Sequence, residues 1–284
     1  MATLGGDAAD LLASRSYTPP NSFQVNTIIV ASVMILIAFI MWNVPYLRDA
    51  IMGLKFLVVA THEVGHIVTG LLMGGTITSV CVDPNDGGMT MICGLQRTEP
   101  RVTPEHLRFP LTMEQLHRSD KIMVTLTMGY IWSSIIGFLY IFCSFDIFAS
   151  KVASFTIAFG LLVPLVRAIR IIPFVSVACL EGLLIGLWFG DHGNALRFYV
   201  LFVGVLNLFY VVWDYFDDVV FEKRHASDCV QFALFLGFPS SAYFLLWFLY
   251  TVGVYIAAIF AGIMVFRKSS DEMYAEAATF LPTR

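Results

Sequence analysis

Two histidines and a glutamate stand close together in the segment LKFLVVATHEVGHIVTGLLMGG, as His62, Glu63 and His66. Residues i and i+4 share one face of an α-helix, so the two imidazoles of this HExxH pattern can bind one Zn²⁺. Glu63 then lies beside the open coordination position, where its carboxylate can accept a proton from an attacking water. The pattern is therefore typical of peptide-bond hydrolysis by a zinc-activated water, without a covalent intermediate.

The setting of these three side chains strengthens the metal-site interpretation. They are the strongly polar cluster of an apolar stretch, residues 51–73. The alternative is a pair of structural histidines and an ion-paired glutamate inside a helix bundle. Ionisable groups are expensive within a membrane and usually functional there, so three of them within five residues favour a metal site.

A catalytic zinc needs a third protein ligand, and the other four histidines of the chain lie in polar segments. The run NLFYVVWDYFDDVVFEKR offers Asp214, Asp217 and Asp218 near the end of an apolar helix. At about 1.5 Å per residue, Asp214 matches the depth of the imidazoles best. We therefore expect Asp214 as the third ligand, with Asp217 and Asp218 as alternatives or as interfacial caps. Asp228 follows a serine in a pattern typical of a helix N-terminus.

The composition indicates the environment in which this chemistry takes place. Hydrophobic residues make up 58% of the 284 positions and charged residues only 13%, whereas soluble domains carry about 25% charged residues. A soluble enzyme is therefore excluded. The net charge of −4 provides no basic surface for phosphate contacts, so no nucleic-acid partner is expected. We expect a multi-pass integral membrane protein, although the sequence does not specify which membrane.

Apolar runs of about the length that crosses a 30 Å hydrocarbon core recur along the chain. They predict an all-α polytopic fold with six to seven transmembrane helices. Within residues 152–189, Arg167, Arg170 and Pro173 mark either a turn at the interface or a broken helix. We expect a transmembrane metalloprotease domain over residues 27–268, between polar tails at 1–26 and 269–284. The runs are residues 27–47, 51–73, 122–148, 152–166, 171–189, 198–221 and 243–266.

The segment 74–121 is polar and is expected to be an extramembrane or interfacial loop. Two β-branched runs within it flank the turn sequence 83–88, Asp-Pro-Asn-Asp-Gly-Gly, which predicts a β-hairpin directly after the HExxH helix. The hairpin edge near Gly87 and Gly88 can pair with an unwound substrate and hold it extended. Alternatively, the hairpin only fills the cavity, because irregular backbone at membrane depth is tolerated beside protein or water.

These motifs together resemble the site-two protease family of intramembrane zinc metalloproteases, and in particular its small peptidase M50B-like branch. The motifs that carry the resemblance lie between residues 56 and 229: the HEVGH helix, Gly87-Gly88, Gly129-Tyr130, the stretch 214–218 and Ser227-Asp228. The family's usual third-ligand motif reads Asn-Leu, then Pro, then Asp-Gly, whereas here Asn207-Leu208 leads to Asp214-Tyr215 without that Pro and Gly.

The resemblance implies a Zn²⁺ cofactor, a transmembrane protein substrate and cleavage within or near the lipid bilayer. Asn207 is expected to hydrogen-bond either the substrate backbone or a neighbouring helix. Two other functions stay open: a zinc transporter, and a catalytically inactive relative that acts as a membrane scaffold. A transporter needs further metal ligands on a neighbouring helix, and no other apolar segment contains a histidine.

Overall fold

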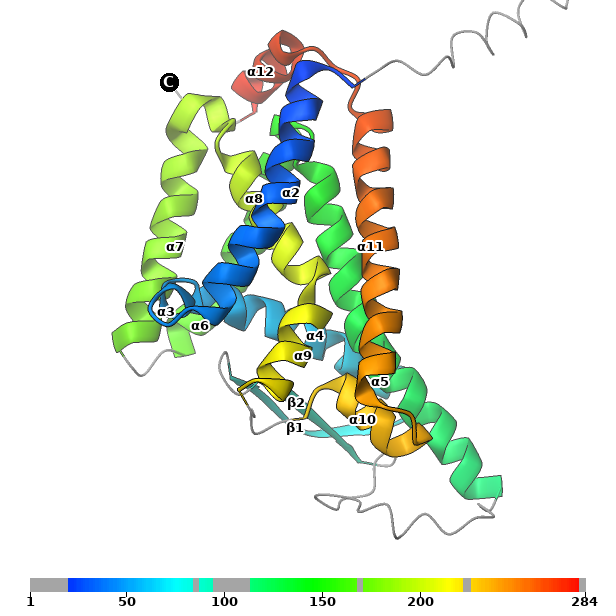
Figure 1. Ribbon diagram of the computed structural model, residues 1–284. Helices are drawn as coiled ribbons and strands as arrows, with labels where there is room; N and C mark the ends of the chain where they lie inside the picture. Colours follow the sequence, from blue (N-terminus) through cyan, green and yellow to red (C-terminus); the bar gives the residue numbers. More distant parts are fainter. Residues whose placement is uncertain (1–19, 84–86, 94–112, 168–170, 222–225, 281–284) are drawn as a thin grey trace, which may run out of the picture.

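Long apolar helices make up most of the computed structural model, which describes residues 20–83, 87–93, 113–167, 171–221 and 226–280. Five of them stand side by side (Figure 1) and are long and apolar enough to cross a membrane, counted over the described residues. The protein is therefore a multi-pass integral membrane protein, with a sixth span if the bent pair described below counts as one. The five are α2 (Ser22–Asn43), α5 (Met113–Cys143), α6 (Ile147–Arg167), α7 (Ile171–Phe189) and α11 (Ser240–Val265).

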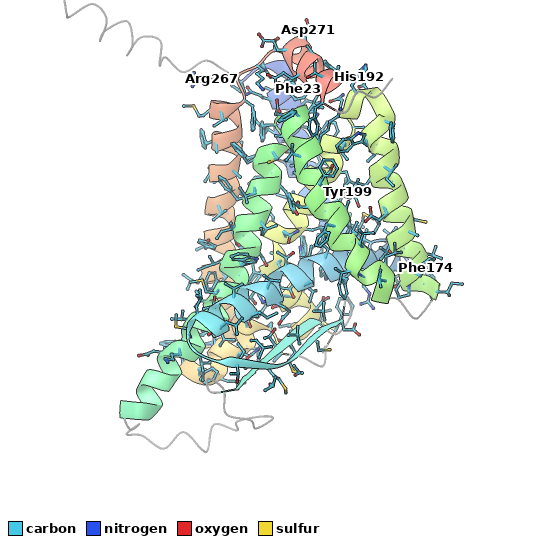
Figure 2. The ribbon with its side chains drawn as sticks, turned by 180° about the vertical axis from the view of Figure 1, so that it is seen from behind. Phe23, Phe174, His192, Tyr199, Arg267 and Asp271 are labelled. Carbon is cyan, nitrogen blue, oxygen red and sulfur yellow. The ribbon has the colours of Figure 1, made fainter. Side chains whose placement is uncertain are left out.

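The HExxH helix α4 (Met52–Leu72) is not among these candidate spans. It runs across the long helices rather than alongside them (Figure 2) and follows a single helical turn, α3 (Leu47–Ala50). Small residues let α4 approach its neighbours closely: a Cβ added at Gly65 would lie 2.5 Å from the Met128 carbonyl of α5. The helix that carries the chemistry is thus held tightly against the bundle.

At the centre of the bundle lies α8 (Leu196–Leu208), which packs against α5, α2 and α6 and is buried on nearly every side. At Phe209 the chain bends by 54° into α9 (Tyr210–Val219). The bend leaves a carbonyl without its helical partner, and the indole Nε1 of Trp213 donates to Leu206 O at 3.0 Å. Because of this bend, the acidic residues of α9 do not continue along the axis of α8.

A two-stranded antiparallel hairpin follows α4, as the sequence predicts, and completes the expected all-α fold with a small β insertion. Its strands are β1 (Thr76–Asp83) and β2 (Gly87–Cys93), with Val80 opposite Thr90 and Val82 opposite Gly88. The turn residues 84–86 and the following segment 94–112 lie outside the described residues. The hairpin packs on α4, so one face of β2 lies over the HExxH helix.

Three shorter elements complete the chain: the 3₁₀ turn η2 (Gly190–Gly193), α10 (Asp228–Leu236) and α12 (Ser270–Thr279). Within the polar segment after residue 268, α12 caps one end of the bundle (Figure 1) and buries Met273 and Ala277. The buried Lys151 donates from Nζ to Ala277 O at 2.8 Å. Two apolar side chains one helical turn apart give α12 a face to bury, despite its polar composition.

Candidate metal centre

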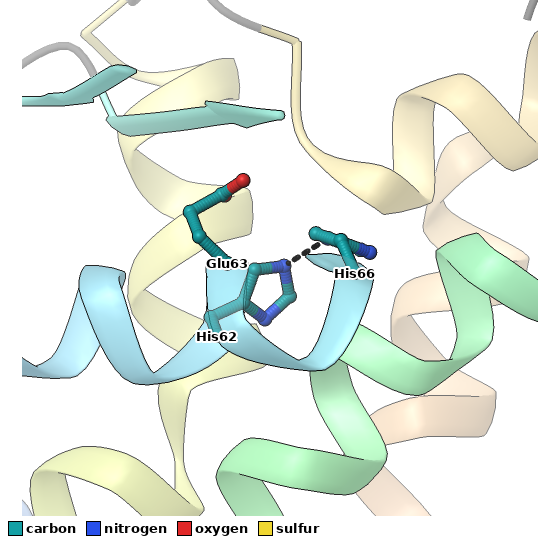
Figure 3. A group of neighbouring side chains, drawn as sticks. All are labelled: His62, Glu63 and His66. Atoms are coloured by element: carbon teal, nitrogen blue, oxygen red, sulfur yellow. Dashed lines mark hydrogen bonds between the residues drawn. The ribbon is translucent and has the colours of Figure 1, made fainter. Parts of the chain in front are cut away.

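The two imidazoles of the HExxH helix face each other in a buried position. His62 and His66 are 3% and 7% exposed, and their Nε2 atoms lie 3.0 Å apart, as the dashed line in Figure 3 shows. The one-turn spacing of α4 therefore does what the sequence predicts and directs both rings to one point.

A carboxylate from a distant segment meets both rings. Asp228 Oδ2 lies 3.0 Å from His62 Nε2 and 3.2 Å from His66 Nε2. Asp228 is the first residue of α10, and the side chain of Ser227 caps this helix by accepting from Val230 N at 3.4 Å. The serine and aspartate are thus the helix start that the sequence indicates. The aspartate is also the acid at the imidazole pair.

The three atoms fit a tetrahedral zinc site. Ligand atoms bound at about 2.0–2.2 Å in tetrahedral geometry are separated by roughly 3.3 Å. The separations among His62 Nε2, His66 Nε2 and Asp228 Oδ2 are 3.0, 3.0 and 3.2 Å. Two nitrogens and one carboxylate oxygen are also the donor chemistry of catalytic zinc centres, which keep a fourth position open. The residues present therefore suit a single Zn²⁺.

Asp214, which we expected as the third ligand, has other partners. Its carboxylate accepts from Tyr130 OH at 2.7 Å and, more weakly, from Tyr210 OH at 3.4 Å. The depth count assumed that both helices stand along the same axis. In the structure α4 lies across the bundle and α9 turns away at the bend, so distance along the chain does not measure depth. The acid at the imidazoles comes from α10 instead.

The two tyrosines that bind Asp214 also enclose His62. The ring centroids of Tyr130 and Tyr210 lie 5.0 and 4.5 Å from that of His62. No hydrogen-bond partner of His62 Nδ1 is found in the part of the chain that the structure describes. Packing against these two tyrosine rings therefore orients the His62 imidazole. Asp214 helps to hold both tyrosines by accepting their hydroxyl hydrogen bonds.

His66 is oriented by a hydrogen bond. Its Nδ1 lies 2.9 Å from the carbonyl oxygen of Thr125 on α5. Because a carbonyl only accepts, Nδ1 must donate, and in the neutral ring Nε2 then presents its lone pair to the site. Metal-binding histidines are commonly fixed in this way.

The other two acidic residues of α9, Asp217 and Asp218, bind different partners. Asp217 Oδ2 accepts from Trp42 Nε1 at 2.9 Å and lies 3.9 Å from the buried Lys55 Nζ, so it joins α9 to α2 and α4. Asp218 Oδ2 accepts from Ser227 N at 2.9 Å and from Ser227 Oγ at 2.8 Å. Asp218 thereby fixes the residue that precedes Asp228.

Glu63 extends from α4 toward the hairpin (Figure 3). Its Oε2 accepts from Thr90 Oγ1 at 2.6 Å, and the carboxylate also packs directly against Gly88. Ligand atoms of Glu63, His62 and His66 all lie within 4.8 Å of one another, the spacing of a group able to hold a metal ion. The carboxylate is thus close enough to serve a water at the metal site.

Gly129 of α5 provides the space that the imidazoles occupy. A Cβ added there would lie 2.5 Å from Cε1 of both His62 and His66, and 2.6 Å from His62 Nε2. Carbon atoms in ordinary van der Waals contact are about 3.5–4.0 Å apart. Any larger residue would therefore displace both rings.

A family model described as peptidase M50B-like matches residues 31–103 and 111–258, which include α4, the hairpin, α5, α9 and α10. The chain belongs to the peptidase M50B-like family. It is thereby a member of the site-two proteases, as the sequence motifs indicated. Comparisons of the M50B-like chain with curated proteins and with solved structures give no match.

Several residues of this M50B-like site have no signal in the sequence that reveals their contacts. Gly129 was part of a motif, but small residues in membrane helices are common and gave no sign of the imidazoles beside it. Of the expected substrate-binding residues, Gly87 begins β2 and Gly88 faces Glu63. Asn207 is buried in α8 and donates to Val203 O at 2.9 Å within its own helix. A substrate role for these three residues stays a prediction.

Proposed function

We propose that this protein is an intramembrane zinc metalloendopeptidase that hydrolyses peptide bonds of membrane-spanning protein substrates. The observation that carries the proposal is the convergence of His62, His66 and Asp228 in a buried position of a multi-pass membrane protein. Membership of a peptidase family supports hydrolysis as the reaction. In a membrane protein, buried ionisable groups of this kind usually mark the functional site.

The residues of the site have distinct parts in the reaction. His62, His66 and Asp228 would hold the ion, which when bound polarises the scissile carbonyl and makes water a better nucleophile at neutral pH. Glu63 accepts the proton of the attacking water and passes it to the leaving amine. Thr125, through its carbonyl, keeps His66 in the tautomer that faces the site.

The hairpin is the proposed substrate platform. A helical substrate hides its scissile carbonyl within its own hydrogen bonds, so the segment to be cleaved must first be held extended. A strand edge can do this by pairing with the substrate backbone, and this hairpin packs on the helix that carries Glu63. We place Gly87 and Gly88 at that platform, with the lipid bilayer as the surrounding medium.

The rival functions make different demands. A zinc transporter needs a series of metal sites along a path. Among the described residues, the potential ligands that meet the spacing for a metal ion gather at one place, around His62 and His66. An inactive scaffold does not need an acid at the imidazoles or a carboxylate beside them. The observed geometry therefore favours the peptidase.

The test is replacement of the proposed general base in the full chain, purified and reconstituted into liposomes with a panel of fluorescently labelled single-span peptides. Glu63→Gln should bind zinc in the same stoichiometry as the wild type, because Glu63 is not a ligand. Its kcat should fall by about 10²–10⁴-fold, the usual contribution of a general base.

Three results would count against the proposal. Zinc-loaded wild-type protein that cleaves no member of the panel would favour the scaffold. Undiminished cleavage by Glu63→Gln would remove Glu63 from the mechanism. Zinc uptake into wild-type liposomes, in the absence of cleavage, would identify a transporter.

A further inference from the structure

One face of β2 follows the HExxH helix along its length. Side chains of alternate strand residues point to the same side, so Gly88, Thr90 and Ile92 share a face. Gly88 and Thr90 contact Glu63, while Ile92 packs against Gly70, two helical turns further along α4. The strand therefore packs lengthwise on α4. Its position along the helix places Thr90 over Glu63.

The Thr90 hydroxyl donates a hydrogen bond to the Glu63 carboxylate. The donor–acceptor distance is 2.6 Å, within the short range of hydrogen bonds to charged oxygens, and Thr90 and Glu63 are 8% and 4% exposed. A buried carboxylate needs hydrogen-bond partners, and this one is supplied by a different segment of the chain. The bond leaves lone pairs on the carboxylate for the proton of an attacking water.

Gly88, on the same face of β2, also restricts the carboxylate. The position of a Cβ at Gly88 would fall on the Oε1, Cδ and Cγ atoms of Glu63, so only glycine leaves room for the side chain. Glu63 thus lies in a slot made by one strand residue that donates a hydrogen bond and another that provides space. A glutamate has three side-chain torsions, and without such a slot it would sample several rotamers.

We infer that Thr90 is a positioning residue for the Glu63 carboxylate, which it holds from the hairpin at a place within 4.8 Å of the imidazole nitrogens. The inference rests on the proposed function, because this positioning matters only if Glu63 transfers a proton. A general base must be held within about 0.5 Å of its productive position by side chains that are themselves fixed, and Thr90 is fixed by the β1–β2 pairing. Substrate binding and proton transfer then depend on the same strand.

The kinetic test uses three threonine variants of the full chain in liposomes. Thr90→Val keeps the shape and the β-branched backbone preference but removes the hydroxyl, and it should lower kcat by about 10–100-fold, the loss of one charge-assisted hydrogen bond. KM should change by less than about twofold, since this bond positions the base rather than binding substrate. Thr90→Ser should restore most of kcat. Thr279→Val is the control, because Thr279 is exposed on α12, outside the hairpin, and donates to Glu276 O.

A second measurement needs no activity and separates this inference from the proposed function. Thermal unfolding of the zinc-free protein is compared for the wild type, Thr90→Val, Glu63→Ala and the double variant. Residues in direct contact give non-additive effects in such a cycle. Thr90→Val should therefore shift the unfolding midpoint in the wild-type background and have little effect once Glu63 is removed.

Additive effects in the cycle would overturn the inference, as would an increased kcat or an effect on KM alone in Thr90→Val. Failure of Thr90→Ser to restore kcat would also overturn it, since the hydroxyl would not be the group that acts. If the zinc-loaded wild type cleaves nothing, the proposed function fails, and the cycle alone decides whether Thr90 positions Glu63.

Discussion

A methyl group added at Gly129 should abolish the metal site while leaving the fold intact. The new Cβ would lie 2.5 Å from Cε1 of both His62 and His66, about 1 Å closer than carbon atoms pack. Metal–ligand distances tolerate deviations of only about 0.2 Å. Because α4 is held against α5 at Gly65, we expect the rings to relieve this clash by moving relative to Asp228. We therefore expect Gly129→Ala to weaken zinc binding at least about 100-fold, beyond the range of changes around a metal site that leave its ligands in place.

Zinc affinity is measured by competition with a chelator, beside thermal unfolding of the zinc-free protein. Two alanine variants serve as controls. Gly137→Ala also produces a clash at 2.5 Å on α5, but with the backbone of Leu208, so it should lower stability and leave zinc affinity unchanged. Gly253→Ala meets nothing within 4 Å and should change neither quantity. Wild-type zinc affinity in Gly129→Ala would refute the geometry proposed for the site.

Two further predictions concern the acidic residues. Asp228→Ala should reduce bound zinc far more than Asp214→Ala, because Asp228 Oδ2 meets both imidazoles whereas Asp214 binds tyrosine hydroxyls; the reverse order in metal analysis would return the ligand role to Asp214. Asp217→Asn should keep full zinc stoichiometry but lower the free energy of unfolding by about 3–5 kcal/mol, because it removes the carboxylate charge beside the buried Lys55. Unfolding in a denaturant titration checks this value, and an unchanged midpoint would show that the pair contributes nothing.

The sequence predicted the elements and the imidazole pair well because both depend on local periodicity. Apolar runs define helices wherever they occur, and the spacing of His62 and His66 is a property of any α-helix. The hairpin was recognisable from its turn residues for the same reason. Each of these features is determined by residues within about twenty positions of one another.

The proximity of Asp228 to the imidazoles could not be predicted in this way. This proximity depends on the crosswise path of α4 and the bend at Phe209, neither of which has a local signal strong enough to orient one helix relative to another. Asp228 was recognised as a helix start, which it is, but helix starts are common and carry no information about what lies opposite. The contacts of Gly129 and Thr90 could not be predicted from the sequence either. Both residues contact α4, which is a separate segment of the chain.

The separation of the donors along the chain has a consequence for biosynthesis. His62 and His66 are made early, whereas Asp228 belongs to a helix near the end of the sequence, after α5 to α9. During synthesis of α5 to α9 a nascent chain therefore carries the imidazoles without Asp228, the acid that we propose as the third ligand. Under the proposed function, cleavage would therefore require α10 to have joined the bundle.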